Sequence, residues 1–423
     1  MRLAARLAAL ALAPISSREQ DRLRSLTLSN LAAGLGVLGN SDRLVWNLPR
    51  DNGEGSAAHR LAMLLHARTQ DDFYPPGRSH VGVLALAPAL TLAPAGEPAD
   101  LWVALAAGYR VTCAVSAAYA LIAQRRGFRP SSVFGPLGAA AAGAVTLGAT
   151  SVEEIANAIA LAASMAGGTN QSWIAGTDEW LLEVGAAARA GVEAARFASA
   201  GASAAPDGLE GTAGWAAAFF DDPGGHRLDL LLDAPPPLID GVARKPYPVS
   251  GIAQVATELA CRFHQSLQGE PADSIVLTVS EAEGTYPGSL NRGPFRSRSD
   301  ALMSLSLCVA CGMADGIVRL ARLEDPNQAE LAAIVRTIEV RLAPSLEETH
   351  ATLAVSAARR TCEASASGSE ILFPSWKEVT NELDALCRRT EADEVAVRSA
   401  AELVGAGALD ARAISELMNY GHE

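Results

Sequence analysis

Two adjacent carboxylates and a histidine stand in one Pro/Gly-rich segment, Thr69-Gln-Asp-Asp-Phe-Tyr-Pro-Pro-Gly-Arg-Ser-His80. Histidine exchanges protons near neutral pH, and a positioned carboxylate can assist that transfer. Asp71 and His80 are therefore candidates for general acid–base chemistry, and Asp72 is a candidate for binding the substrate. Each also has a structural interpretation, because His80 could cap the apolar helix that follows and the aspartates could be a helix cap or loop solubilisers.

Further candidate side chains are spread along the chain. Arg129 lies in Gly127-Phe-Arg-Pro130, and Lys245 begins Lys245-Pro-Tyr-Pro248. Either cation could hold an anionic group, but Arg129 could equally form a structural ion pair and Lys245 could be exposed before a proline turn. Glu183 is a general base or a helix-surface acid.

Composition limits the partners of this chain. The 423 residues are 49% hydrophobic and only 5% aromatic, which favours a large core of closely packed, Ala-rich helices. The formal net charge of −13 argues against nucleic acid and against anionic membrane surfaces as partners. It leaves an anionic small molecule possible, because a local basic pocket can oppose the global charge.

Several segments resemble a signal peptide, membrane spans or a metal-binding cysteine pair. Residues 1–13 resemble a signal peptide, but they run into a charged amphipathic stretch, so we expect a first packed helix. The charge-free windows 130–152 and 155–177 are rich in Gly, Ala and Ser, and we expect buried helices there, not membrane spans. Cys308-Val-Ala-Cys311 has no second ligand pair nearby, so we expect two buried, reduced thiols of a cytoplasmic protein.

The elements that must position the candidates fall into two groups. Residues 1–240 read mostly as helices, including Asp100 to Arg126 and Gly185 to Ala200, and Ser151 is a plausible helix cap. After Ala234-Pro-Pro-Pro237 the sequence contains runs that are rich in β-branched residues and alternate between apolar and polar side chains, a pattern typical of strands.

In the second group we expect strands at 273–280, 337–342 and 351–356, with another possible strand at 362–372, and helices at 250–267, 299–323, 328–336 and 392–405, with one more beginning at Ser375. The predicted fold is mainly α. It has a large all-helical domain, 1–240 completed by 388–423, and an inserted, smaller α+β lid domain, 241–387.

Several motifs together resemble the MmgE/PrpD family, which includes 2-methylcitrate dehydratase, cis-aconitate decarboxylase and iminodisuccinate epimerase. Gly127-Phe-Arg-Pro130, with the Ala/Gly-rich helix after it, is similar to the family's Gly-Phe-His-Pro element. Leu209-Glu-Gly-Thr-Ala-Gly-Trp-Ala-Ala-Ala-Phe219 resembles LEG-x-x-GF-x-x-x-F. Lys245-Pro-Tyr-Pro248 and Pro374-Ser-Trp-Lys-Glu-Val379 are similar to two later motifs. The resemblance implies the same two-part layout, with an active site between the domains.

The family's usual site residues are only partly present. By resemblance, His80, Asp71 and Asp72 match a histidine and an Asp pair, while the histidine of Phe-His-Pro falls on Arg129. The usual Lys and His of another motif fall on Trp180 and Glu183. We expect catalytic roles for His80, Asp71, Arg129 and Glu183. The residues expected to bind the substrate are Asp72, Tyr74, Trp180, Lys245, Ser250, Gln254, Tyr286 and Arg292, of which Ser250 and Gln254 fall on histidines of the family.

These losses predict a changed substrate. Dehydrating a tricarboxylate needs a base, an acid and several cationic side chains. Most of the histidine and lysine positions that supply these groups in the family are substituted in this chain. We therefore expect a substrate that is less charged and more hydrophobic than methylcitrate. The resemblance implies an isomerase or lyase without metal or organic cofactor. Because family members similar to iminodisuccinate epimerase also occur in polyketide tailoring, we expect a cyclase or rearrangement catalyst that acts on a hydrophobic, polyketide-type intermediate. The alternatives are an ordinary dehydratase, decarboxylase or epimerase of a small polycarboxylate, and a catalytically inactive binding paralogue. We also expect a homodimer formed through the helical domain.

Overall fold

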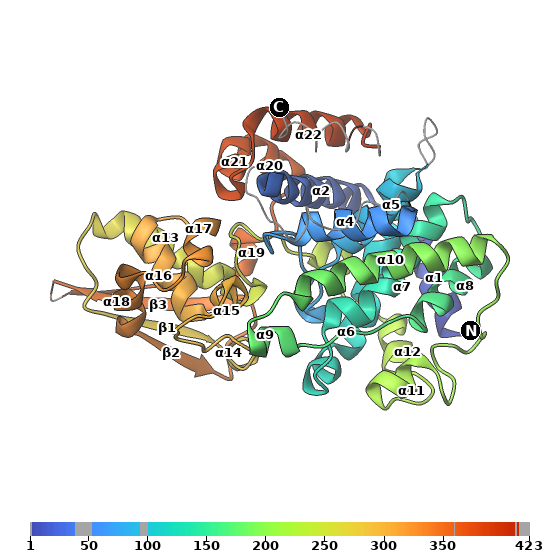
Figure 1. Cartoon of the computed structure of the whole chain (residues 1–423), viewed down its shortest axis with the longest axis horizontal. Coiled ribbons are helices and arrows are strands. Elements are labelled where there is room, and N and C mark those ends of the chain that lie inside the picture. The colour runs from blue at the N-terminus through green and yellow to red at the C-terminus, as the bar shows by residue number, and fades with distance from the viewer. Residues whose placement is uncertain (1, 39–52, 94–99, 359, 411–412, 414–423) are drawn as a thin grey trace.

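Two parts lie side by side in the computed structural model, which describes residues 2–38, 53–93, 100–358, 360–410 and 413 (Figure 1). One part is helical and holds the N-terminal half of the chain. The other contains the sheet and its covering helices. The described residues thus confirm the predicted fold class, mainly helical with a small sheet in the C-terminal half.

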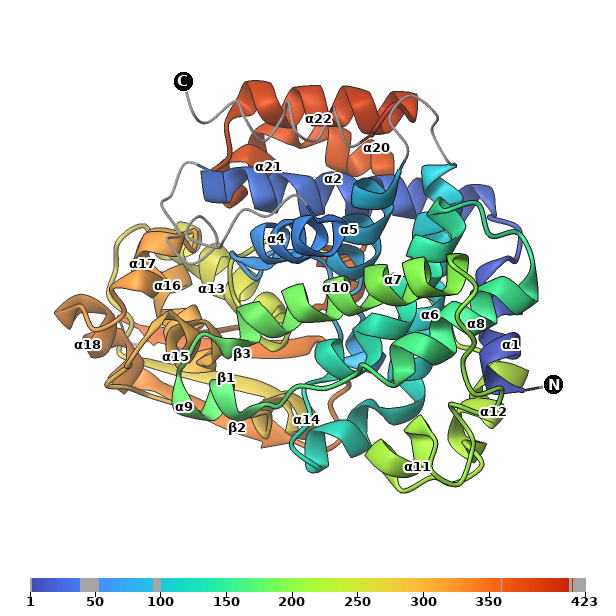
Figure 2. The same ribbon diagram turned by 45° about the vertical axis from the view of Figure 1, so that its right-hand side comes forward.

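The helical part is built from a layered set of helices around an Ala-rich core (Figure 2). Its elements are α1 (Leu3–Ala11), α2 (Ser17–Leu38), α4 (Glu54–His66), η1 (Pro75–Gly77), α5 (Gly82–Leu92), α6 (Leu101–Arg125), α7 (Pro130–Thr146), α8 (Val152–Ala163), α9 (Gln171–Ala175), α10 (Glu179–Ser199), α11 (Trp215–Phe220), α12 (His226–Asp233) and η2 (Ile239–Gly241).

Helices α6, α7 and α10 approach one another so closely that glycine is required at the crossings. A Cβ on Gly138 would lie 1.8 Å from Thr112 Oγ1, and a Cβ on Gly191 would lie 2.2 Å from the Cβ of Ala139. The apolar run of α6 is the one helix in the described residues that is long and apolar enough to cross a membrane, and 78% of its most apolar window is buried inside the molecule. Such burial is what a core helix shows.

Helix ends in this part follow the local sequence. Ser151 and Glu154 form a capping box at the start of α8, as its sequence predicts. Helix α10 begins at Glu179, ahead of the predicted start at Gly185, so that Trp180 and Glu183 belong to its first turns.

The second part contains a mixed sheet of four strands in the order β2-β1-β3-β4. The strands are β1 (Ser274–Ser280), β2 (Ile338–Ala343), β3 (His350–Ala357) and β4 (Arg360–Ser367). Strand β1 pairs with β2 in parallel and with β3 antiparallel, and β3 pairs with β4 antiparallel. Alternate residues of β1, namely Ile275, Leu277 and Val279, are buried in the core of this part.

The helices of this part are η3 (Gly251–Ala253), α13 (Gln254–Leu267), α14 (Glu281–Gly284), α15 (Arg298–Met303), α16 (Leu305–Asp315), α17 (Leu320–Glu324), α18 (Ala329–Thr337) and α19 (Gly368–Ile371). The single helix predicted over 299–323 is wrong. Ser304 has extended backbone and caps α16, and the left-handed Gly316 ends that helix, so the segment folds into three short helices. Cys308 and Cys311 lie buried in α16.

The chain returns to the helical part at its C-terminal end. Helices α20 (Trp376–Asn381), α21 (Leu383–Thr390) and α22 (Glu394–Ala406) contact α2 and lie above it in Figure 1. A second capping box, Ser375 with Glu378, begins α20. The return therefore starts near residue 375, ahead of the predicted position at 388.

Candidate active site

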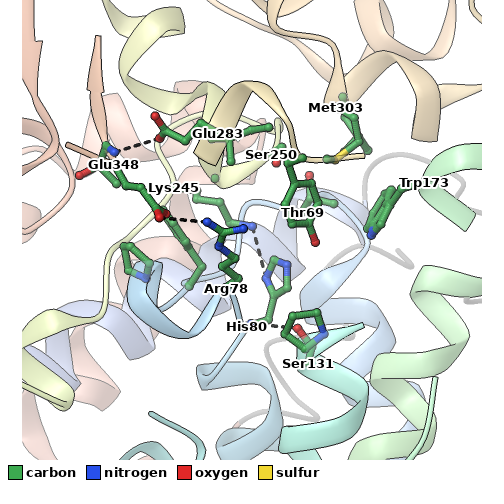
Figure 3. A pocket seen from close by; sticks show the side chains of 18 of the residues that line it. Thr69, Arg78, His80, Ser131, Trp173, Lys245, Ser250, Glu283, Met303 and Glu348 are labelled. Carbon is green, nitrogen blue, oxygen red and sulfur yellow. Dashed lines mark hydrogen bonds and ion pairs between the residues drawn. The ribbon is translucent and has the colours of Figure 1, made fainter. Parts of the chain in front are cut away.

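A pocket opens where the two parts meet, and residues of both parts line it (Figure 3). Its cavity volume is about 80 Å³, inside about 780 Å³ of empty space that continues into open solvent. It is lined by Thr69, Phe73, Pro75, Arg78, His80, Arg129, Pro130, Ser131 and Trp173 from the helical part, and by Lys245, Ser250, Gly251, Ile252, Ala282, Glu283, Tyr286, Leu302, Met303, Glu348 and Thr349 from the second half of the chain.

A short β-bridge brings two distant segments together beside the pocket, which Phe73 lines. Phe73 and Ala243 exchange both backbone hydrogen bonds, at 2.9 and 2.8 Å. This bridge holds the loop that follows α4 against the segment that precedes Lys245. As a result the Lys245 ammonium lies 3.6 Å from Oδ1 of Asp71, and both side chains are buried.

Asp71 joins two histidines. Its Oδ1 lies 2.9 Å from Nδ1 of His66, and its Oδ2 lies 2.9 Å from Nδ1 of His80. The two rings meet edge to face with centroids 4.3 Å apart. The backbone N–H of His80 donates to the Ser131 hydroxyl at 3.0 Å, which fixes this histidine against the first turn of α7.

The neighbours of His66 determine its tautomer. Arg129 lies with one guanidinium nitrogen 2.9 Å from Nε2 of His66. A guanidinium can only donate, so Nε2 accepts and the ring proton stands on Nδ1, where it is donated to Asp71. The four side chains therefore form one continuous chain of hydrogen bonds, from Arg129 through His66 and Asp71 to His80.

Burial and the local charges set the protonation of this cluster. Burial lowers the pKa of His66 to about 4 and that of His80 to about 3, so both rings are neutral at pH 7. Burial alone would raise the pKa of Asp71, but the two histidines and Lys245 hold the pKa of its carboxyl well below the ordinary value. The carboxylate is thus ionised and the rings are uncharged.

The role of Lys245 follows from the same assignment. Its Nζ lies 3.4 Å from Nδ1 of His80. Because Nδ1 carries the proton donated to Asp71, Lys245 is an electrostatic neighbour of that nitrogen and forms its ion pair with the Asp71 carboxylate. Nε2 is then the basic nitrogen of His80, and His80 lines the pocket.

Arg129 is held from several directions at the first turn of α7. Its guanidinium donates to the backbone carbonyl of Trp180 and to a Glu183 carboxylate oxygen at 3.3 Å. Glu183 is itself fixed by the backbone N–H of Thr169 at 2.8 Å. The Arg129 guanidinium also lies over the ring of Trp173, 5.5 Å from its centroid.

Two stacked indoles form the apolar wall beside Arg129. The rings of Trp173 and Trp180 lie 5.4 Å apart at an angle of 26°. Trp173 faces the pocket, while Trp180 lies behind it in the core and donates its indole N–H to Ser299 at 2.8 Å. In Figure 3, Trp173 and Met303 stand on one side of the pocket, and Arg78, Glu283 and Glu348 stand on the other.

Glu283 adds a second titratable group. It is buried in the pocket wall, and burial raises its pKa to about 7 although it accepts hydrogen bonds from Ser280 and from the backbone of Thr349. Tyr286 also lines the pocket, and burial raises the pKa of its phenol. Tyr286 therefore remains a hydrogen-bond donor at neutral pH.

His66, Asp71 and His80 offer three atoms within 4.8 Å of one another, a spacing that could suit a metal ion. The surroundings fit a proton network better. Both Nδ1 atoms point at the carboxylate as donors, and the charged groups of Arg129 and Lys245 lie against the same cluster. These cations would repel a divalent ion.

The structure places the predicted site residues in three groups. Those that line the pocket are His80, Arg129, Lys245, Ser250 and Tyr286. Those that lie behind it and contact a lining residue are Asp71, Trp180 and Glu183.

The residues of the third group do not line the pocket and form structural hydrogen bonds. Asp72 accepts from Asn30, Tyr109 and the backbone of Gly82, and so anchors the start of α5. Tyr74 donates to the carbonyl of Pro237. Gln254 binds backbone groups of Tyr247 and Val249, and Arg292 donates to the carbonyls of Ile338 and Val335.

Several site residues escaped the sequence analysis, among them His66, Arg78, Trp173, Glu283 and Glu348. His66 ends an apolar helix and gives no motif of its own. Its spacing of five residues from Asp71 was the only available signal. In the sequence, Glu283 is the third residue after a helix-capping serine. It also has that place in the structure, where its backbone N–H donates to the side chain of Ser280.

The comparison with family models gives a match to the MmgE/PrpD N-terminal domain over residues 7–227. No curated protein matches the chain. The matched range contains Asp71, His80 and Arg129, and covers the helical part up to α12. The helical architecture with its small C-terminal sheet agrees with that match. The chain belongs to the MmgE/PrpD family, whose members are generally lyases and isomerases.

Proposed function

We propose that the protein is a lyase or isomerase that needs no cofactor and removes a proton next to a carbonyl or carboxylate, with His80 as the base. The observation that carries this proposal is the pairing of a neutral, pocket-lining His80 with the buried, ionised Asp71 at 2.9 Å. A carboxylate on Nδ1 fixes the ring tautomer and stabilises the imidazolium that forms when Nε2 takes a proton.

The pocket also supplies groups for the charge that develops on the substrate. When a C–H bond next to a carbonyl breaks, the electron pair moves to the carbonyl oxygen and leaves an enolate. Lys245, Arg129 and the phenol of Tyr286 are donors in the same wall. Donors already in place stabilise an oxyanion without reorganising at the moment of reaction. An isomerase then returns the proton, and a lyase expels a leaving group.

The charge balance of the pocket favours a substrate with at most one carboxylate. Lys245 is paired with Asp71, and Arg129 is paired with Glu183. Glu283 adds a partly ionised acid to the wall. A tricarboxylate would meet these carboxylates as well as the cations, so its binding would be weak.

The apolar wall favours a hydrophobic body for the substrate. Phe73, Trp173, Ile252, Leu302 and Met303 line the pocket. Within this class we propose a ring-forming or rearranging step on a natural-product intermediate of polyketide type, held in a reactive conformation by that wall. Such a molecule exceeds the cavity of about 80 Å³, so it would extend into the open mouth or require the two parts to separate.

A substrate panel in D₂O tests the proposal. The panel contains β-keto thioesters with apolar chains, branched monocarboxylates, and the polycarboxylates 2-methylcitrate and cis-aconitate. We expect deuterium exchange at the α-carbon, seen by NMR, for an apolar substrate, and loss of that exchange in His80→Gln. Turnover of the polycarboxylates alone would instead support the ordinary family activity.

A binding paralogue without catalysis is the remaining alternative. It predicts that apolar ligands bind but that no α-proton exchanges in any member of the panel. The assembled network of Arg129, His66, Asp71 and His80 argues against it, because a buried set of ionisable groups is expensive to keep where only shape is needed.

A further inference from the structure

We propose that Glu348 is a specificity residue that neutralises Arg78 from within the chain, so that the pocket rejects a second carboxylate on its ligand. This inference rests on the proposed function in one respect, namely that the substrate binds in this pocket. It concerns residues to which no role has been given above.

Arg78 and Glu348 meet across the rim of the pocket. A guanidinium nitrogen of Arg78 lies 2.9 Å from Oε1 of Glu348, and both residues line the cavity (Figure 3). Arg78 comes from the loop after η1 in the helical part, and Glu348 from the connection between β2 and β3. The pair therefore joins the two parts within the wall of the pocket.

Arg78 is held in place independently of Glu348. Its other terminal nitrogen donates to the side chain of Gln124 in α6. Its backbone is left-handed, with φ of 49°, at the end of η1. If the Glu348 carboxylate were removed, the guanidinium would remain oriented at the rim as a cation with one free edge.

Glu348 differs from the other two carboxylates that pair with pocket cations. Asp71 and Glu183 stand behind Lys245 and Arg129, whereas Glu348 lines the pocket itself. Its side chain is 40% exposed, against 10% for Arg78. Removing the Glu348 carboxylate leaves the mostly buried Arg78 without a charged partner. A carboxylate of the ligand can then bind Arg78 in the position that Glu348 occupied.

The test compares the binding of two ligands of the same chain length, succinate and butyrate, by isothermal titration calorimetry. We expect Glu348→Gln to bind succinate at least about fivefold more tightly than the wild type does, while its affinity for butyrate changes less than about twofold. The matched control is Glu347→Gln, which makes the same change of charge at the neighbouring, exposed position outside the pocket.

A double variant identifies the cation. In Glu348→Gln with Arg78→Gln, the gain in succinate affinity should disappear. The inference is overturned if Glu347→Gln gains as much as Glu348→Gln, if the gain survives in the double variant, or if Glu348→Gln binds succinate no better than the wild type. The assay measures binding without turnover, so its failure leaves the role of His80 standing, and failure of the exchange test leaves this result standing.

Discussion

Arg129 donates a hydrogen bond to Nε2 of His66 over 2.9 Å, and this contact determines which nitrogen of His66 carries the proton. His66 can then donate only toward Asp71, which leaves the second carboxylate oxygen for His80. His66, which is not among the residues that line the pocket, thus directs one Asp71 oxygen away from His80 and leaves the other to hold that base.

The first prediction concerns stability against pH. The pKa of His66 is lowered from 6.5 to about 4 on folding, so the unfolded chain binds the proton more readily between these values. The free energy of unfolding should therefore fall by about 2 kcal/mol between pH 7.5 and pH 5 through this residue. Urea unfolding at both pH values measures the change.

The control for that experiment is His66→Gln. A carboxamide can donate to Asp71 and accept from Arg129, but it does not titrate. The pH dependence of this variant should be flatter than that of the wild type by about the same 2 kcal/mol. An equal slope in both proteins would show that folding does not lower the pKa of His66.

The second prediction concerns the dyad. Asp71→Asn should lower the rate of α-proton exchange on the order of 10²-fold or more, because the amide can present its N–H to Nδ1 and place the ring in the wrong tautomer. His80→Gln should have an effect at least as large. Exchange rates measured by NMR would refute the assignment if both variants kept the wild-type value.

The third prediction concerns the contribution of Trp180 to the stability of the fold. Trp180 is buried, stacks on Trp173 and binds Ser299. Trp180→Ala should destabilise the fold by roughly 3–5 kcal/mol through the cavity it leaves. Ser299→Ala, which leaves the indole N–H without its acceptor, should lower stability by about 1–3 kcal/mol. Thermal unfolding measures both, and an unchanged midpoint in Trp180→Ala would contradict its place in the core.

The fourth prediction concerns the crossing of α6 and α7. Gly138→Ala would place a Cβ 1.8 Å from Thr112 Oγ1, and it should destabilise the protein by roughly 1–3 kcal/mol. Gly55→Ala is the matched control, because its Cβ would meet only the flexible side chains of Arg189 and Glu193. In α4 that change should be neutral or stabilising by about 0.5–1 kcal/mol. Denaturant midpoints that order the two variants the other way would contradict the packing.

The fifth prediction concerns assembly. We propose a homodimer formed through the helical part, since Ala- and Gly-rich helix faces can pack against a second copy as closely as within one chain. Light scattering at micromolar concentration should give about twice the 43.8 kDa mass of the chain. The mass of a single chain would exclude such a dimer under those conditions.

The sequence predicts the architecture better than the site, for physical reasons. Helix caps such as Ser151 and the alternation in β1 are local signals, and the structure contains both. The break at Ser304 is tertiary in origin, because its hydroxyl binds the distant carbonyl of Asn291 as well as the N–H of Leu307. This contact accounts for the first break in the long helix predicted over 299–323, whereas the second, at the left-handed Gly316, is a local glycine signal that the prediction missed.

At the site, resemblance led to His80, Arg129 and Lys245 because they occupy motif positions. It gave Asp71 a catalytic role and Asp72 a substrate-binding role, whereas Asp72 binds Asn30, Tyr109 and the backbone of Gly82. The backbones of the two aspartates are adjacent, yet one carboxylate faces the histidines and the other faces Asn30 and Tyr109. His66 and Glu348 matter only through what they touch, and no spacing in the chain expresses those contacts.

The bridge between Phe73 and Ala243 has a kinetic consequence. It ties Asp71 and Lys245 into one rigid unit, so their spacing is preserved while a substrate enters. Any opening between the two parts must then separate residues away from this bridge, including the ion pair of Arg78 with the partly exposed Glu348, which salt weakens. Entry and release rates should accordingly rise with ionic strength, while the proton-transfer step itself stays insensitive to it.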